Sequence, residues 1–284
     1  MRTDPSLAAM RRHYELGLEQ ERLTQGHGRL EFERTKEILR RHLPPPPAVI
    51  ADIGGGPGRY ALWLADLGYE IEHRDLIQLH VDQVHRASGG NPRIRSEVCD
   101  ARRLDLETAS VDAVLVLGPL YHLDRRGDRL RVLAEAHRVV RPGGPVFAAA
   151  ISRWAARLDG ILRARPDDAV LTAMEAVVAS VERSGRLPPL FPDSFCGYAH
   201  RPGQLRAELV AAGLEVIDLV CVEGPAFLLH DLGQRLDDDQ GRRVVLETCR
   251  ALERVPELLG IGPHLLATAR QRSRIRAPGL PGSG

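Results

Sequence analysis

The sequence predicts an α/β protein built on a doubly wound, mostly parallel sheet with helices on both faces and a helical cap. From residue 48 onward, short apolar segments alternate with amphipathic ones, which is the pattern of repeated strand–helix–strand units. The segment Val111–Leu117 is almost entirely apolar, as expected of a strand buried on both faces of a parallel sheet. A glycine cluster, Gly54–Gly58, separates the first strand from the first helix, where doubly wound sheets bind ligands.

The core elements can be placed one after another along the chain. Strands are expected at Ala48–Ile53, Tyr69–Arg74, Ile94–Cys99, Val111–Leu117 and Val146–Ile151, and helices at Arg59–Leu67, Leu76–Ala87 and Arg129–Val140. Beyond them the pattern loosens. The expected segments are a helical Trp154–Arg186, an irregular and aromatic Leu187–His200, a helix at Gln204–Ala212, and strands at Glu215–Val222 and His264–Arg270 with helical material between them.

The amino-terminal part is predicted to be helical over Arg11–Leu43, up to the four prolines of Pro44–Pro47, which cannot continue a helix. We therefore expect four parts. They are an N-terminal helical cap segment at 1–47, the ligand-binding core at 48–152, cap insertions plus the remaining core strands at 153–275, and a disordered tail at 276–284.

Composition excludes several classes of protein. The formal net charge of +1 over 284 residues argues against a general nucleic-acid binder, whose phosphate contacts need a basic excess. The four cysteines are scattered without a C-x-x-C pair, and no other metal-ligand spacing is present, so we expect reduced thiols and no metal. Without a long apolar stretch the chain is expected to be cytoplasmic, away from membranes. The chain could form a homodimer, because the sequence does not identify its oligomeric state.

Three acidic residues accompany the glycine loop. Asp52 directly precedes it, Asp75 ends the second strand about 20 residues later, and Asp100 with Ala101 ends the third. Glycines allow backbone N–H groups to approach a ligand closely, and a carboxylate at the position of Asp75 can accept both ribose hydroxyls. Because Gly56–Ala61 also satisfies the G-x-G-x-x-A pattern of nicotinamide-binding proteins, the loop alone does not identify the cofactor.

In Asp52, Gly54, Gly56 and Gly58 the chain resembles the class I S-adenosylmethionine-dependent methyltransferases, whose first motif is an acid followed by G-x-G-x-G. Val111–Val114 and Arg138–Gly144 resemble later landmarks of these Rossmann-like enzymes, so the likeness extends over Val49–Ile151. The resemblance implies S-adenosyl-L-methionine as cofactor and a small-molecule acceptor as partner. The implied cofactor contacts are Tyr14, Asp52, Gly54, Gly55, Gly56, Asp75, Leu76, Asp100, Ala101 and Leu117.

Each contact has an implied role. Asp52 and the loop backbone would hold the amino-acid part of the cofactor, and Asp75 the ribose. Leu76 would pack on the adenine, whose amino group would meet Asp100. For the N-terminal helix two interpretations are open: Tyr14 or Arg22 contacts the methionine carboxylate, or the helix packs on the outer surface with its charges solvated.

The segment Gly118–Leu123 follows the fourth strand, and in the resembled family this region borders the transferring methyl group. His122 is a candidate general base, because an imidazole titrates near neutral pH. A second interpretation, slightly favoured, has His122 cap the next helix or orient the loop. Tyr121 either lines the pocket or packs in it.

Candidates for contact with the acceptor come from the cap. Trp154 follows the fifth strand, and Phe195, Tyr198 and His200 lie in an irregular segment in which aromatic residues concentrate. Such a concentration indicates either an apolar pocket wall or a small separate core. Glu31 and Arg34, three residues apart, are predicted to form an ion pair on a helix face.

The sequence thus predicts metal-free methyl transfer to O, N or C of a small metabolite. Two alternatives stay open: an NAD(P)-dependent oxidoreductase, and a methyltransferase-fold subunit that binds without turnover.

Overall fold

A computed structural model describes residues 12, 14, 22–24, 26–163, 167–188 and 196–271. Its centre is a twisted sheet in which β3, β2, β1, β4 and β5 are parallel neighbours in that order, and antiparallel β9 and then β8 continue it beyond β5. A short β7 pairs with the last two residues of β5, and β6 pairs with β7. The strands are β1 (Val49–Ile53), β2 (Glu70–Asp75), β3 (Ile94–Val98), β4 (Ala113–Val116), β5 (Pro145–Ser152), β6 (Arg186–Leu187), β7 (Gly197–His200), β8 (Leu214–Cys221) and β9 (His264–Gln271).

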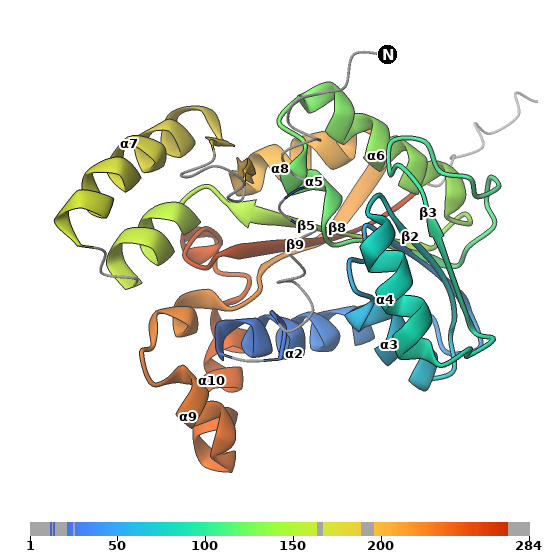
Figure 1. Cartoon of the computed structure of the whole chain (residues 1–284), viewed down its shortest axis with the longest axis horizontal. Helices are drawn as coiled ribbons and strands as arrows, with labels where there is room; N and C mark the ends of the chain where they lie inside the picture. The colour runs from blue at the N-terminus through green and yellow to red at the C-terminus, as the bar shows by residue number, and fades with distance from the viewer. Residues whose placement is uncertain are drawn as a thin grey trace, which may run out of the picture.

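Helices cover both faces of this sheet (Figure 1). On one face lie α6 and α8, and on the other lie α2, α3 and α4. The helices are α2 (Gly26–Arg40), α3 (Arg59–Asp66), α4 (Gln78–Ser88), α5 (Pro119–His122), α6 (Arg126–Val139), a π-helix η2 (Ala156–Arg163), α7 (Asp168–Ser184), α8 (Pro202–Ala211), η3 (Gly224–Leu228), α9 (Leu232–Asp237), α10 (Asp239–Leu252) and η4 (Pro256–Leu258).

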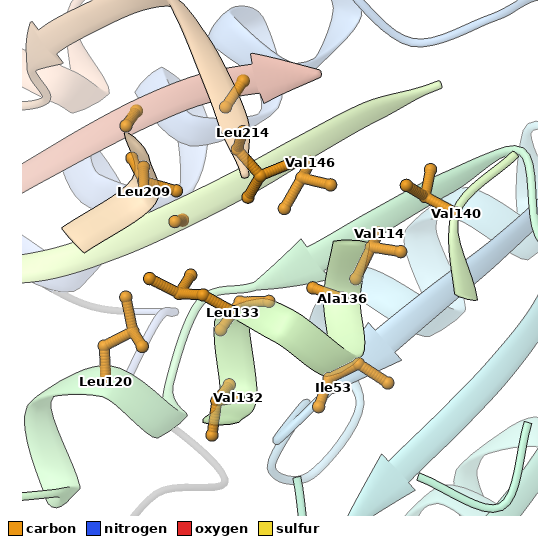
Figure 2. Close-up of a cluster of buried hydrophobic side chains, with 14 of the residues drawn as sticks. Ile53, Val114, Leu120, Val132, Leu133, Ala136, Val140, Val146, Leu209 and Leu214 are labelled. Carbon is orange, nitrogen blue, oxygen red and sulfur yellow. The ribbon is translucent and has the colours of Figure 1, made fainter. Parts of the chain in front are cut away.

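Alternation along each central strand supplies two hydrophobic cores. In β4, Val114 and Val116 face α6, whereas Ala113 and Leu115 face α2 and α3, because successive side chains of a strand point to opposite faces. Figure 2 shows the first core, in which Val132 and Leu133 of α6 pack against the strands. Both faces of β4 are therefore buried, which explains its nearly continuous apolar sequence.

Three predicted segments differ from the observed ones. Arg22–Thr24 form a turn and α2 begins only at Gly26, so Arg11–Leu43 is not one helix. The predicted helix Trp154–Arg186 is two helices, η2 and α7, and Arg186 belongs to β6. The segment predicted to be irregular ends in β7, whose pairing with β5 is a tertiary interaction that local sequence does not reveal. The predicted tail lies outside the described residues.

The N-terminal helix and the segment before β9 come together on one side of the sheet (Figure 1). Arg29 of α2 donates to Asp237 of α9 over 2.5 Å, and Arg34 of α2 pairs with the buried carboxylate of Glu253 after α10. No helix in the described part of the chain is long and apolar enough to span a bilayer.

Candidate functional site

A cleft of about 130 Å³ opens at the carboxyl edge of the parallel strands. The loop after β1, the ends of β2 and β3 and the segment after β4 meet there, because parallel strands end at the same edge. All ten residues that the sequence predicts as cofactor contacts line this cleft, as do Tyr121 and His122: Tyr14, Asp52, Gly54, Gly55, Gly56, Asp75, Leu76, Asp100, Ala101, Leu117, Tyr121 and His122.

The glycine loop is held in place from beneath by His73, which is fully buried in β2. Its Nε2 lies 3.1 Å from the carbonyl oxygen of Gly56, and its Nδ1 lies 2.8 Å from the hydroxyl of Ser96. Because a carbonyl oxygen only accepts, Nε2 carries the proton and Nδ1 accepts from Ser96. Burial lowers the pKa of His73 to about 4, so the imidazole stays neutral and fixes the loop without adding charge.

Asp52, the last but one residue of β1, is buried beneath the same loop. Neither of its carboxylate oxygens receives a hydrogen bond of normal geometry from the described residues. Burial and the nearby charge of Asp75 raise its pKa to about 7, although the backbone N–H of Ala61 acts in the opposite direction. A buried, unsatisfied carboxyl group next to a cleft is suited to receive a cationic group from a ligand.

Asp75, at the end of β2, binds the glycine loop, the residue before α4 and α4 itself. One oxygen accepts from the N–H of Gly56 over 2.9 Å, and the other accepts from the N–H of Ile77 over 2.8 Å and from Nδ1 of His80 over 3.0 Å. Burial alone would raise the pKa of this carboxyl, but the hydrogen bond and charge of His80 and the N–H of Ile77 lower it. Asp75 is therefore an ionised acceptor on the wall of the cleft.

Asp100 follows β3, the strand that pairs with β2, and is bound by the nearby Arg102. The guanidinium and backbone N–H of Arg102 both donate to it, with a shortest distance of 2.7 Å. The carboxylate is partly exposed toward the cleft. It therefore has room for a further donor, such as an exocyclic amino group.

The two candidate catalytic residues belong to α5, the short helix after β4. His122 Nε2 lies 2.7 Å from the hydroxyl of Tyr14, and the ring of Tyr14 contacts both His122 and His80 edge-on with centroid separations of 5.2 Å. Tyr121 also packs against His122. Tyr14 and Arg22 thus both line the cleft, and the predicted contact of either residue with a methionine carboxylate stays a prediction.

Three of the candidates for acceptor contact, Trp154, Tyr198 and His200, do not line the cleft. Tyr198 and His200 of β7 are buried against Arg129 of α6, whose guanidinium stacks 3.7 Å from the ring centroid of Tyr198. Trp154 lies near Arg201, with its ring 5.9 Å from that guanidinium, and Phe195 lies outside the described residues. Tyr198 and His200 are therefore buried inside the protein, whereas Trp154 is exposed at the surface away from the cleft.

Several lining residues were not predicted from the sequence, among them His80, Ile77 and Tyr60. The predicted ion pair of Glu31 with Arg34 is also not formed. Arg34 pairs with Glu37 and Glu253 instead, and Glu31 pairs with Arg22. Helical spacing places Glu31 and Arg34 close enough to interact, but partners from other segments bind both more closely.

Two glycines of the loop offer a direct test of how tightly it packs. Gly54 (φ +65°) and Gly56 (φ +57°) both have left-handed backbones, so alanine is strained at either position. A Cβ on Gly54 would lie 2.6 Å from Cγ of Pro119, whereas one on Gly56 would meet nothing within 4 Å. We expect Gly54→Ala to lower the free energy of unfolding in urea by about 1–3 kcal/mol more than Gly56→Ala. Equal losses of stability in the two variants would show that Pro119 and the rest of α5 move aside at no cost in free energy.

Comparison with known proteins finds a likeness in the core. Residues 51–148 match the sequence pattern of a family described as methyltransferase domain. The ubiquinone/menaquinone biosynthesis C-methyltransferase UbiE of Acidiphilium cryptum (strain JF-5) is 32% identical over 122 residues, which make up 42% of this chain and 48% of that protein. The chain thus spans about half the length of the curated relatives it matches.

Solved structures extend the likeness to nearly the whole chain. The 1,6-didemethyltoxoflavin-N1-methyltransferase of Burkholderia thailandensis, solved with its substrate and S-adenosylhomocysteine, has a TM-score of 0.57 at 17% identity and covers 95% of this chain and 90% of its own. SpnF, a [4+2]-cyclase, has a TM-score of 0.53 at 19% identity, with coverages of 84% and 80%. At such identities the likeness establishes the fold, and the predicted fold class is confirmed. Since the two proteins bear names of different reactions, the reaction must be argued from the site.

Proposed function

We propose that this chain transfers a methyl group from S-adenosyl-L-methionine to a small-molecule acceptor. Its Rossmann-like fold and the match of residues 51–148 to a methyltransferase domain support this proposal. The observation that carries the proposal is the buried carboxyl group of Asp52, to which no residue that the structure describes gives a hydrogen bond of normal geometry. Such a group selects a cation, and the amino-acid part of this cofactor carries an ammonium group.

The other residues of the cleft fit the remaining parts of the cofactor. Asp75 would accept hydrogen bonds from the ribose hydroxyls, Asp100 would accept one from the adenine amino group, and Leu76 and Leu117 line the same cleft as apolar contacts. When bound, the cofactor supplies a methyl group on a sulfonium, which is itself the electrophile. The protein therefore has to hold the donor, orient the acceptor and exclude water.

For acceptors whose attacking atom carries a proton, we assign its removal to the pair of His122 and Tyr14. The two side chains share a hydrogen bond of 2.7 Å between Nε2 and the hydroxyl. Both line the cleft, His122 from α5 after β4 and Tyr14 from the N-terminal part of the chain. With the hydroxyl of Tyr14 donating to Nε2, Tyr14 would take the proton of the acceptor as it passes its own proton to His122, which becomes an imidazolium and acts as the general base.

The same observation disfavours a nicotinamide cofactor. In dinucleotide-binding proteins the pyrophosphate lies against the glycine loop and the helix that follows it. Here Asp52 lies beneath that loop, buried, with a second carboxylate nearby at Asp75. A pyrophosphate at this position would face two acidic groups, whereas an ammonium group would be attracted by both.

Calorimetric titration with S-adenosylhomocysteine and, separately, with NADH tests the assignment. We expect micromolar binding of the first and no heat above dilution for the second. Incubation of the enzyme with methyl-labelled cofactor and a panel of phenols, quinols and amines then tests for turnover. Binding of NADH alone would overturn the proposal, and cofactor binding without transfer to any acceptor would favour a binding subunit.

The raised pKa of Asp52 makes a prediction about pH. In the free protein this carboxyl is mostly protonated below pH 7, and an ammonium ligand favours its ionised form, so binding releases a proton. Affinity for S-adenosylhomocysteine should therefore rise by up to tenfold per pH unit as the pH increases toward 7, and level off above it. Calorimetry between pH 5.5 and 8, in two buffers of different ionisation enthalpy, measures both effects. Asp52→Asn should bind more weakly and lose the pH dependence.

The proposal also places the protein in the cytoplasm, which agrees with its four free cysteines. A homodimer, a lack of affinity for nucleic acid, and the division at residues 47, 152 and 275 remain predictions from the sequence.

A further inference from the structure

A polar cluster lies at the same edge of the sheet as the cleft, but beyond β4 and β5. It consists of Arg22, Glu31 of α2, Glu223 after β8 and His264 at the start of β9. Because β9 runs antiparallel to β5, with His264 opposite Ile151, its first residue stands where β5 ends. The topology thus brings together residues that are far apart in the sequence.

The members of this cluster are bound to one another. Arg22 donates to both oxygens of Glu31, at 2.5 and 3.1 Å, and His264 Nδ1 lies 2.5 Å from Glu223 and 3.8 Å from Glu31. Burial would lower the pKa of His264, but the charges of Glu31 and Glu223 raise it to about 9. Within the described residues, two cations therefore face two carboxylates, so that the charges of this cluster balance.

A second cavity of about 40 Å³ opens onto this cluster. Leu117, Ala149 and Leu266 form an apolar wall, and His264 and Glu31 form the polar one. The ring hydrogen bond of His264 is made by Nδ1, to Glu223, and no such bond joins the second nitrogen, Nε2, to another described residue. The cavity shares Arg22, Tyr60 and Leu117 with the cofactor cleft, so the two are neighbours.

The charges and size of this cavity limit what it can bind. Its volume is that of roughly three water-sized groups, which suits one functional group rather than a whole metabolite. An added anion would face Glu31 and Glu223, and an added cation would face Arg22 and His264, so either would lose hydration without a free counter-charge. A neutral oxygen on an apolar frame can accept from Nε2–H and pack against Leu117 and Ala149.

We propose that this second cavity, with His264 as the donor, is the subsite that anchors the methyl acceptor by a neutral hydroxyl or carbonyl oxygen. The inference rests on the proposed function and narrows the acceptor to an uncharged, oxygen-bearing and otherwise apolar compound. An imidazolium that donates to an oxygen withdraws electron density from it. The atom that attacks the methyl group is therefore a different atom of the acceptor, and His264 is a binding residue rather than a catalytic one.

The test uses protein saturated with S-adenosylhomocysteine, so that the cofactor cleft is filled. Phenol, benzoate and benzylamine are titrated separately into protein with ¹⁵N-labelled histidine, and the imidazole signals are followed by NMR. We expect phenol alone to shift the signals of His264 in a saturable way. His264→Ala should weaken phenol binding, followed by ligand-observed NMR, at least tenfold, and Glu33→Gln, on the same helix but away from the cavity, should not change it.

Ala149→Leu provides a second variant that fills the cavity and leaves every ion pair intact. It should abolish phenol binding while S-adenosylhomocysteine still binds within threefold of the wild-type affinity. Phenol binding that persists in both variants would overturn the proposal. So would stoichiometric binding of Zn²⁺ or Mn²⁺ in place of phenol, because ligand atoms of Glu31, Glu223 and His264 lie within 4.8 Å of one another. Failure of S-adenosylhomocysteine to bind at all would instead overturn the proposed function.

Discussion

Replacing Asp75 with asparagine is expected to weaken the binding of S-adenosylhomocysteine by about 100-fold while the protein stays folded. The carboxylate accepts from the N–H groups of Gly56 and Ile77 and from His80, and the proposed ribose hydroxyls would add to these donors. Asparagine keeps the shape but loses the charge and replaces one acceptor oxygen with a donor. Hydrogen bonds to charged groups contribute about 1.5–3 kcal/mol each, and the loss of one such bond to the ligand, with the loop less well held, corresponds to about 100-fold.

Asp82→Asn is the matched control, because Asp82 lies on α4, outside the lining of the cleft, and accepts an exposed hydrogen bond from Gln78. Calorimetry of the two variants beside the wild type, with circular dichroism to confirm folding, makes the measurement. A Kd for Asp75→Asn within threefold of the wild type would mean that the ribose binds elsewhere. The alternative with a nicotinamide cofactor also uses Asp75 for a ribose, so this variant tests the site, and the pH dependence at Asp52 tests the identity of the ligand.

The cofactor cleft could be predicted because its parts share a simple geometric rule. Asp52, Asp75 and Asp100 each stand at or near the end of a strand, and parallel strands end at one edge of a sheet. Once the strands are recognised from their apolar runs, the three acids must converge, whatever the helices do. The sequence alone does not reveal which acid is ionised, because that depends on burial and on neighbours such as His80.

The second cavity could not be predicted in this way. Its polar groups come from residues 31, 223 and 264, and their convergence depends on α2 lying under the carboxyl edge and on β9 running antiparallel. Local spacing pairs Glu31 with Arg34, three residues along the helix. Tertiary packing overrides that preference by bringing Glu253 to Arg34 and the turn at Arg22 to Glu31.

The aromatic residues near β7 show what local sequence leaves undecided. Their concentration indicates either a pocket wall or a small separate core, and the structure buries Tyr198 and His200. A buried core is distinguished here from a pocket wall by the charged residues that pack against the aromatic rings. Arg129 of α6 and Glu208 of α8 pack against Tyr198 and His200. The sequence around Arg129 and Glu208 gives no sign that these two residues would bind there.

Because Arg129, His200 and Glu208 form this buried network, we expect a large loss of stability in the variant Glu208→Gln. Glu208 accepts from Arg129 over 2.7 Å and from His200 over 3.3 Å, and all three side chains are buried. Removing one charge leaves the guanidinium of Arg129 buried without its partner, which typically costs about 3–5 kcal/mol. Glu182→Gln breaks the exposed pair with Arg157 and should cost less than about 1 kcal/mol. Urea unfolding of both variants measures the difference.

The pKa of Glu208 gives the same experiment a second readout. Burial alone would raise this pKa, but hydrogen bonds from His200 and Arg129 lower it to about 2, from an ordinary value of 4.5. A carboxyl with a lowered pKa stabilises the fold above its ordinary pKa, and the benefit disappears as the pH falls toward 2. The gap in stability between wild type and Glu208→Gln should therefore be full at pH 6 and shrink below pH 4.5. Because Arg129 also donates to the carbonyls of Leu123 and Asp124 directly after α5, the variant should weaken cofactor binding too, whereas a network unconnected to the site would lose stability alone.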